Sequence, residues 1–190
     1  MKKILSIISL SVAVLFSASC ADFLTKVPET DLSPDTFFTT EAELEMWTNN
    51  FYAEFLPEAD NLTAQVADDH YTSSFNAIEK GTRSPSSASW GVGTWQPLRR
   101  INYFLENNKC ADPAIKAEYD GVAYFFRAMF YFNKVRQYGD IPYYDKVIGS
   151  SDEAMLNKPR DPRGYVMLKI CQDLDKAYEL LPDKWEAYSV

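Results

Sequence analysis

Apolar residues recur every three or four positions in four stretches of the chain, which is the spacing of one face of an α-helix. The first stretch follows Thr40, which opens a Thr-x-x-Glu capping box, and Pro57 ends it. Its apolar stripe consists of Leu44, Trp47, Phe51 and Phe55. A second stripe with helical spacing consists of Trp95, Leu98, Ile101, Asn102 and Leu105. Both segments are therefore predicted to be helices that bury one face.

The third stretch predicts a long helix. Asp112 suits its N-cap because a proline follows at the first helical position, and Gly139 suits its C-cap after Tyr138. Eight aromatic residues between 119 and 138 occupy several faces of this helix, so we expect other helices around it. Gly121 in its interior costs about 1 kcal/mol relative to alanine, which indicates a close crossing by another helix.

The fourth stretch repeats the Asp-Pro helix start at Asp161-Pro162 and ends at Pro182. Its stripe consists of Tyr165, Leu168, Cys171, Leu174, Tyr178 and Leu181. Strand patterns are weak throughout the chain, so the predicted fold class is all-α, built from antiparallel helix pairs. No clean 34-residue repeat is visible, but a helical-repeat array whose sequence has drifted remains open.

The N-terminus has the pattern of a secretory signal peptide. Lys2 and Lys3 precede an apolar run over residues 4–16, and small residues lead into Cys20. The run is shorter than the roughly 20 residues that span a bilayer. A cysteine at this position is typical of a bacterial lipobox, in which it becomes the acylated N-terminus. We expect residues 1–19 to be removed and Cys20 to carry the lipid, with residues 20–34 as a tether; the alternative is an ordinary signal peptide with a chance cysteine.

Charge narrows the choice of partners. The formal net charge is −8, and removal of Lys2 and Lys3 with the signal peptide would change it to −10. An acidic chain argues against nucleic acid as a partner. It also argues against electrostatic binding to anionic lipids, so the acyl group would be the membrane link.

Cysteines and histidine offer little for metal chemistry. Cys110 and Cys171 remain once Cys20 is set aside, and an exported protein can pair such residues. Because Cys171 falls in the apolar stripe of the fourth helix, we predict a buried free thiol instead. The chain has one histidine and no Cys-x-x-Cys, so we expect no metal site and no cofactor other than the lipid.

Two linked motifs lie in and after the third predicted helix. They are Gly121-Val122-Ala123-Tyr124-Phe125-Phe126-Arg127-Ala128 and Tyr138-Gly139-Asp140-Ile141-Pro142. Shorter motifs are Cys20-Ala21-Asp22-Phe23-Leu24, Leu32-Ser33-Pro34-Asp35-Thr36-Phe37-Phe38, Trp95-x-x-Leu98-x-x-Ile101-Asn102 and Asp173-Leu174-x-x-Ala177. Together they resemble the SusD/RagB family of surface lipoproteins, and the resemblance covers essentially all of residues 20–190.

The resemblance implies a tetratricopeptide-like helical domain over residues 35–190 and a role without catalysis. Proteins of this family lie in the outer membrane as outward-facing, lipid-anchored lids. They bind glycans or other nutrients and deliver them to a SusC-like TonB-dependent transporter. Family members usually continue well beyond the position of Val190, so the chain resembles the N-terminal portion of one, and part of the ligand surface would ordinarily come later.

Residues 57–93 lack a helical or strand period and are rich in Ser, Thr, Asp and Gly. Such long loops are usually functional. We expect the ligand surface in the loop from Asp68 to Trp95, with aromatic rings that cover the apolar face of a sugar and charged groups that bond its hydroxyls. The candidates are Trp90, Tyr71, Asp68, Asp69 and Arg83. Trp90 lies outside any stripe and is either a loop anchor or a platform for the ligand, whereas Trp95 opens a helical stripe and is predicted to be core.

Other polar residues receive structural interpretations. Arg127, among aromatic residues, is predicted to be a buried or semi-buried ion-pair partner rather than a ligand contact, and Arg99-Arg100 a solvated face. Asp68-Asp69-His70 does not predict a hydrolase, because adjacent side chains point in different directions. No nucleophile elbow, phosphate-binding loop or His-Glu-x-x-His is present. Two alternatives to nutrient binding stay open: a helical module that binds a protein segment, and a degradative surface enzyme.

Overall fold

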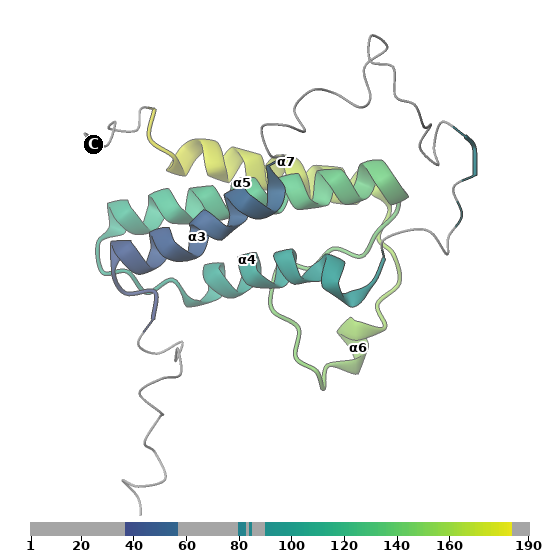
Figure 1. Cartoon of the computed structure of the whole chain (residues 1–190), viewed down its shortest axis with the longest axis horizontal. Helices are drawn as coiled ribbons and strands as arrows, with labels where there is room; N and C mark the ends of the chain where they lie inside the picture. The colour runs from purple at the N-terminus through teal and green to yellow at the C-terminus, as the bar shows by residue number, and fades with distance from the viewer. Residues whose placement is uncertain (1–36, 57–79, 83, 85–89, 184–190) are drawn as a thin grey trace, which may run out of the picture. The chain divides into compact units, whose positions relative to one another are not determined.

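A computed structural model of the chain describes residues 37–56, 80–82, 84 and 90–183. The chain divides into two units, Met1–Phe37 and Phe38–Val190, and the helices below all belong to the second. They are α3 (Glu41–Phe55), η3 (Val92–Trp95), α4 (Gln96–Asn107), α5 (Pro113–Tyr138), α6 (Glu153–Leu156) and α7 (Arg163–Leu180) (Figure 1). No strand occurs within the described ranges, so the predicted all-α class is confirmed.

The helix starts follow the local capping chemistry. The Glu43 carboxylate accepts hydrogen bonds from the Thr39 and Thr40 N–H groups at 2.9 and 3.0 Å, which closes the predicted capping box of α3. These backbone hydrogen bonds, first that of Thr39, lower the pKa of Glu43. At α5, the Asp112 carboxylate accepts from the N–H groups of Ala114 and Ile115 at 2.8 and 3.3 Å. The predicted boundaries of both helices are confirmed because the signals that set them are local.

The start of α7 differs from its prediction. Pro162 occupies the N-cap and Arg163 is the first helical residue. The Asp161 carboxylate does not cap the helix; it accepts from the Tyr143 N–H at 2.7 Å and pairs with Lys158 at 2.6 Å. The carboxylate of Asp140 accepts from the Arg163 N–H at 2.8 Å instead. The α7 N-terminus is thus capped from a residue that follows α5.

Helix α5 lies at the centre of the helical unit, with α3 and α4 on one side and α7 on the other (Figure 1). A Cβ at Gly121 would come within 3.0 Å of the Leu181 side chain and 3.1 Å of Leu180 Cβ, so the predicted close crossing is confirmed at the end of α7. Gly139 has a φ of 76°, and its N–H donates to the Val135 carbonyl at 2.8 Å as the predicted C-cap.

Edge-to-face and tilted aromatic pairs run without interruption through the core. Ring centroids 5.1–6.4 Å apart connect, in order, Phe38, Phe104, Phe51, Phe126, Phe55, Phe130, Trp95 and Trp90. Such pairs contribute about 0.5–1.5 kcal/mol each beyond the area they bury. This aromatic chain joins α3, α4 and α5 and ends at the residues that precede α4.

Helix α7 buries a different face from the predicted one. Its buried residues are Val166, Ile170, Asp173 and Ala177. The predicted stripe is largely exposed: Leu168 is 55% exposed, Tyr178 is 85% exposed and Cys171 is also exposed. The prediction of a buried Cys171 thiol was therefore wrong, although both Cys171 and Cys110 are free. The physical reason is that α7 has apolar residues on more than one face, and contact with α5 selects the face that includes Val166 and Ile170.

Candidate ligand pocket

A buried polar cluster supports one wall of the candidate site. Arg127, which is 4% exposed, donates two hydrogen bonds of 2.7 Å to the carboxylate of Asp173, so the predicted buried ion pair is confirmed. Burial disfavours the charged Arg127, but the hydrogen bonds and charge of Asp173 outweigh that effect and hold its pKa above the ordinary value. The guanidinium also donates to Asn102 Oδ1 at 3.2 Å and to the Asp145 carbonyl at 3.3 Å.

The cluster fixes the chain between α5 and α6. The Asn102 side-chain amide donates to the carbonyls of Tyr144 and Lys146 at 3.1 and 3.2 Å. The Tyr131 hydroxyl donates to the Tyr144 carbonyl at 2.8 Å and accepts from the Tyr144 N–H at 2.6 Å. Burial raises the pKa of Tyr131 well above its ordinary value, so the hydroxyl remains a donor. A segment without regular structure is thus held in place by three buried side chains.

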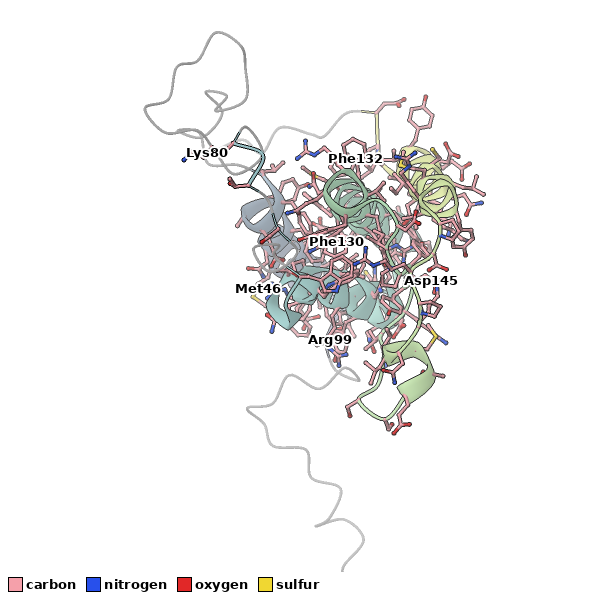
Figure 2. The ribbon with its side chains drawn as sticks, turned by 90° about the vertical axis from the view of Figure 1, so that its right-hand side faces the viewer. Met46, Lys80, Arg99, Phe130, Phe132 and Asp145 are labelled. Carbon is pink, nitrogen blue, oxygen red and sulfur yellow. The ribbon has the colours of Figure 1, made fainter. Side chains whose placement is uncertain are left out.

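A pocket of about 610 Å³ opens between this segment and the start of α4, which is a size typical of ligand sites. Its lining consists of Trp90, Trp95, Gln96, Leu98, Arg99, Asn102, Pro142, Tyr144, Lys146, Val147, Ile148, Leu156, Lys158, Pro159 and Arg160. Arg99 extends from α4 on the side where the α6 connection passes (Figure 2), and its guanidinium donates to the Ile148 carbonyl at 2.8 Å. The lining combines apolar surface with a few polar groups, as binding sites for small molecules do.

Trp90 both packs on the core and lines the pocket. It is half-buried, and its ring meets those of Trp95 and Tyr138 edge-on at centroid distances of 5.1 and 4.8 Å. The Arg160 guanidinium lies 4.9 Å from the Trp90 ring centroid. Trp90 therefore packs against the core on one side and lines the pocket on the other. On the pocket side the Arg160 guanidinium lies over its ring.

Trp95 likewise both packs against the core and lines the pocket. It packs against the core through Phe130 at 5.5 Å, as its place in a helical stripe predicts. It is only half-buried, however, and faces the pocket beside Tyr144, 6.1 Å away between ring centroids. A single turn of 3-10 helix, η3, lies between Trp90 and the start of α4, and both tryptophans line the same wall of the pocket.

Behind this wall lies the Lys134 ammonium, 5.4–6.0 Å from the centroids of four aromatic rings. The rings belong to Trp90, Trp95, Phe130 and Tyr138. Lys134 is 8% exposed, and this burial lowers its pKa. A cation over aromatic faces is attracted by their quadrupoles, so Lys134 helps to hold the rings together from the core side. Figure 2 shows Phe130 in the interior on the side of α4 and Phe132 on the outside of α5.

Of the other predicted site residues, Tyr71, Asp68, Asp69 and Arg83 lie outside the described residues, as does Cys20. Their roles stay predictions. Sequence reasoning missed the residues that the α5–α7 connection contributes, above all Tyr144, Lys146 and Arg160. The only signal in the sequence was the pair of prolines at 142 and 159 that bracket this connection.

Two further observations concern the described residues alone. None of their helices is long and apolar enough to cross a membrane. No group of three or more His, Cys, Asp or Glu residues among them is arranged to hold a metal ion.

The fold is of the tetratricopeptide-like helical kind, and residues 22–190 match a SusD-like family described as "Starch-binding associating with outer membrane". The chain belongs to this SusD-like family. A curated relative, SusD-like protein P2 of Formosa agariphila, is 28% identical over 197 residues, which cover 93% of this chain and 38% of the relative. The crystal structure of a SusD-like protein from Bacteroides fragilis superimposes with a TM-score of 0.67 at 26% identity, over 86% of this chain and 34% of that one. The chain thus spans little more than a third of the length of these relatives.

Proposed function

We propose that the chain is a non-enzymatic, glycan-binding lipoprotein of the outer membrane. The observation that carries the proposal is the pocket beside Trp90, Trp95 and Tyr144, in a fold whose family is described as starch-binding. A sugar ring presents an apolar C–H face to an aromatic side chain and a rim of hydroxyls to groups such as the Gln96 amide. Glycoside hydrolysis needs two facing carboxyl groups, and the part of the lining that the structure describes contains neither aspartate nor glutamate, which supports binding without cleavage.

The proposal extends to the membrane and to a partner. Cys20 would carry the acyl chains that hold the protein at the outer membrane, facing outward. The bound glycan would pass to a SusC-like TonB-dependent transporter. The family description, with its association with the outer membrane, supports this arrangement. The transporter should co-purify with the tagged, acylated chain from detergent-solubilised outer membranes; recovery of the chain without any transporter would argue against the partnership.

The binding step is tested by calorimetric titration of the detergent-solubilised full chain with a panel of soluble oligosaccharides. We expect saturable binding and no new reducing ends. Trp90→Ala should weaken binding several-fold, since stacking on an aromatic ring contributes about 1–3 kcal/mol. Tyr178→Ala is the matched control, because that aromatic ring is 85% exposed and lies outside the pocket lining. Release of reducing ends would refute the non-enzymatic assignment, and an unchanged Kd in Trp90→Ala would remove this pocket from the site.

One observation favours a second candidate, a helical module that binds a protein segment. Leu168, Leu174 and Tyr178 on α7 are 55%, 42% and 85% exposed, and exposed apolar residues on one helix are typical of interaction surfaces. The same glycan panel separates the two functions. If no glycan binds while a membrane protein is retained in a manner that Leu168→Glu abolishes, the module is the better description.

A further inference from the structure

The charge of the pocket is opposite to that of the chain. The whole sequence has a formal net charge of −8, yet among the described residues that line the pocket four are cationic and none is anionic. The four are Arg99, Lys146, Lys158 and Arg160. Because clefts with apolar walls focus the field of the charges that line them, this pocket attracts anions although the protein as a whole repels them.

Most of this positive charge is not neutralised within the described residues. Lys158 has a carboxylate partner, Asp161, at 2.6 Å. Among the residues that the structure describes, no carboxylate pairs with Arg99, Lys146 or Arg160. The two arginines donate only to main-chain carbonyls there, of Ile148 and Asp140, which leaves further N–H donors of each guanidinium for a ligand. All three cationic side chains belong to exposed residues at the pocket.

Arg160 also controls access to the aromatic wall. Its guanidinium carbon lies 4.9 Å from the Trp90 ring centroid, where a stacked sugar would sit. A neutral sugar must displace the cation and gives it no equivalent partner in return. An anionic group on the sugar replaces the lost cation–π contact with charge-assisted hydrogen bonds, which are stronger than neutral ones. The same residue therefore disfavours neutral sugars and favours acidic ones.

We propose that the pocket selects glycans that carry a carboxylate or sulfate group. Arg160 and Lys146 bind the anionic group, and Trp90 stacks on the sugar ring once Arg160 has moved from its face. This inference rests on the proposed function, because it names the chemical class of glycan that the same pocket takes.

The test is a titration of the detergent-solubilised full chain with matched pairs of ligands. One pair is an oligogalacturonate and its carboxyl-reduced, neutral form; the other is a sulfated galactan oligosaccharide and its desulfated form. We expect at least one acidic member to bind about ten-fold more tightly than its neutral counterpart at low ionic strength, with the difference shrinking as salt rises from about 50 to about 500 mM. The two pairs also distinguish carboxylate from sulfate.

Variants then locate the selectivity. Arg160→Gln should lose the preference for the acidic ligand and bind the neutral one at least as tightly as the unmodified chain, because the Trp90 face is free. Lys146→Gln should weaken only the acidic ligand. Arg136→Gln is the control, since Arg136 is an exposed cation of α5 outside the pocket lining, and it should change neither Kd. Circular dichroism melts verify that each variant is folded.

The outcomes separate this inference from the proposed function. Equal binding of the acidic and neutral members of both pairs overturns the selectivity while glycan binding stands. A preference that survives Arg160→Gln and Lys146→Gln overturns the assignment of these residues. If no member of either pair and no oligosaccharide of the wider panel binds, the proposed function itself fails, and the inference with it.

Discussion

Removal of the carboxylate from the buried ion pair is expected to be one of the most damaging single changes in the described core. In Asp173→Ala, the guanidinium of Arg127 loses both of its 2.7 Å hydrogen bonds to the carboxylate and remains 96% buried. Asn102 Oδ1 and the Asp145 carbonyl are neutral and cannot replace the charge. A buried cation without its partner is the unfavourable state that governs the result.

The magnitude follows from that burial. Breaking a buried pair by removing one partner costs about 3–5 kcal/mol, whereas a solvent-exposed pair contributes about 0–1 kcal/mol. With an m-value of about 2 kcal/mol/M, a loss of about 4 kcal/mol lowers the urea midpoint by about 2 M. The matched control is Asp175→Ala, which removes an exposed carboxylate from the same helix and should shift the midpoint only slightly.

Urea unfolding followed by far-UV circular dichroism measures both variants. If Asp173→Ala shifts the midpoint no more than Asp175→Ala, the buried-charge reasoning is wrong. The double variant Arg127→Met/Asp173→Leu separates stability from the site. It should recover most of the lost free energy of unfolding, because apolar residues of similar volume can replace a buried pair. It should still bind glycans more weakly, because the Asp145 carbonyl loses the donor that holds the pocket wall.

Four further predictions concern positions that do not line the described pocket. Gly121→Ala should lower the free energy of unfolding by about 1–2 kcal/mol despite the gain in helix propensity, because its Cβ would meet Leu181 at 3.0 Å. Gly164→Ala, whose Cβ meets nothing within 4 Å, should leave stability unchanged or raise it by up to about 1 kcal/mol in the same urea assay. Cys171 should react in the folded protein with an aromatic disulfide reagent within seconds to minutes, and slow reaction that requires denaturant would contradict its exposure on α7. Cys20→Ser should move the chain from the detergent phase to the aqueous phase in phase separation, and continued partitioning into detergent would refute the lipid anchor.

The features predicted best from the sequence were those set by interactions between residues close together in the chain. The capping box at Thr40 and the aspartate cap at Asp112 satisfy backbone donors within three residues, so they mark the starts of α3 and α5 without reference to the rest of the fold. Gly121 predicted a close crossing because glycine inside a long helix costs stability unless something approaches it. In each case the identity of the local residues is enough to predict the structural feature.

The predictions failed for features that depend on contacts between residues far apart in the sequence. The face of α7 depends on α5, and α7 has apolar residues on more than one face, so periodicity alone selected Cys171 over Ile170. The cations of the pocket come from α4 and from the α5–α7 connection, which lies 47–61 residues further along the chain than Arg99. The cations lie around one pocket because the Asn102 side chain donates hydrogen bonds to the carbonyls of Tyr144 and Lys146. No local sequence pattern predicts this contact.

The paired indoles of the pocket have a consequence for spectroscopy. The rings of Trp90 and Trp95 lie 5.1 Å apart at 77°, close enough for their electronic transitions to couple in a chiral arrangement. Such a pair produces a near-UV circular dichroism signal that depends on the angle between the rings. A guest that stacks on one indole, or a cation that leaves it, alters that angle and the polarity around the chromophore. If the proposed glycan site is correct, we expect ligand binding to change this near-UV signal, which gives a binding assay without an attached dye.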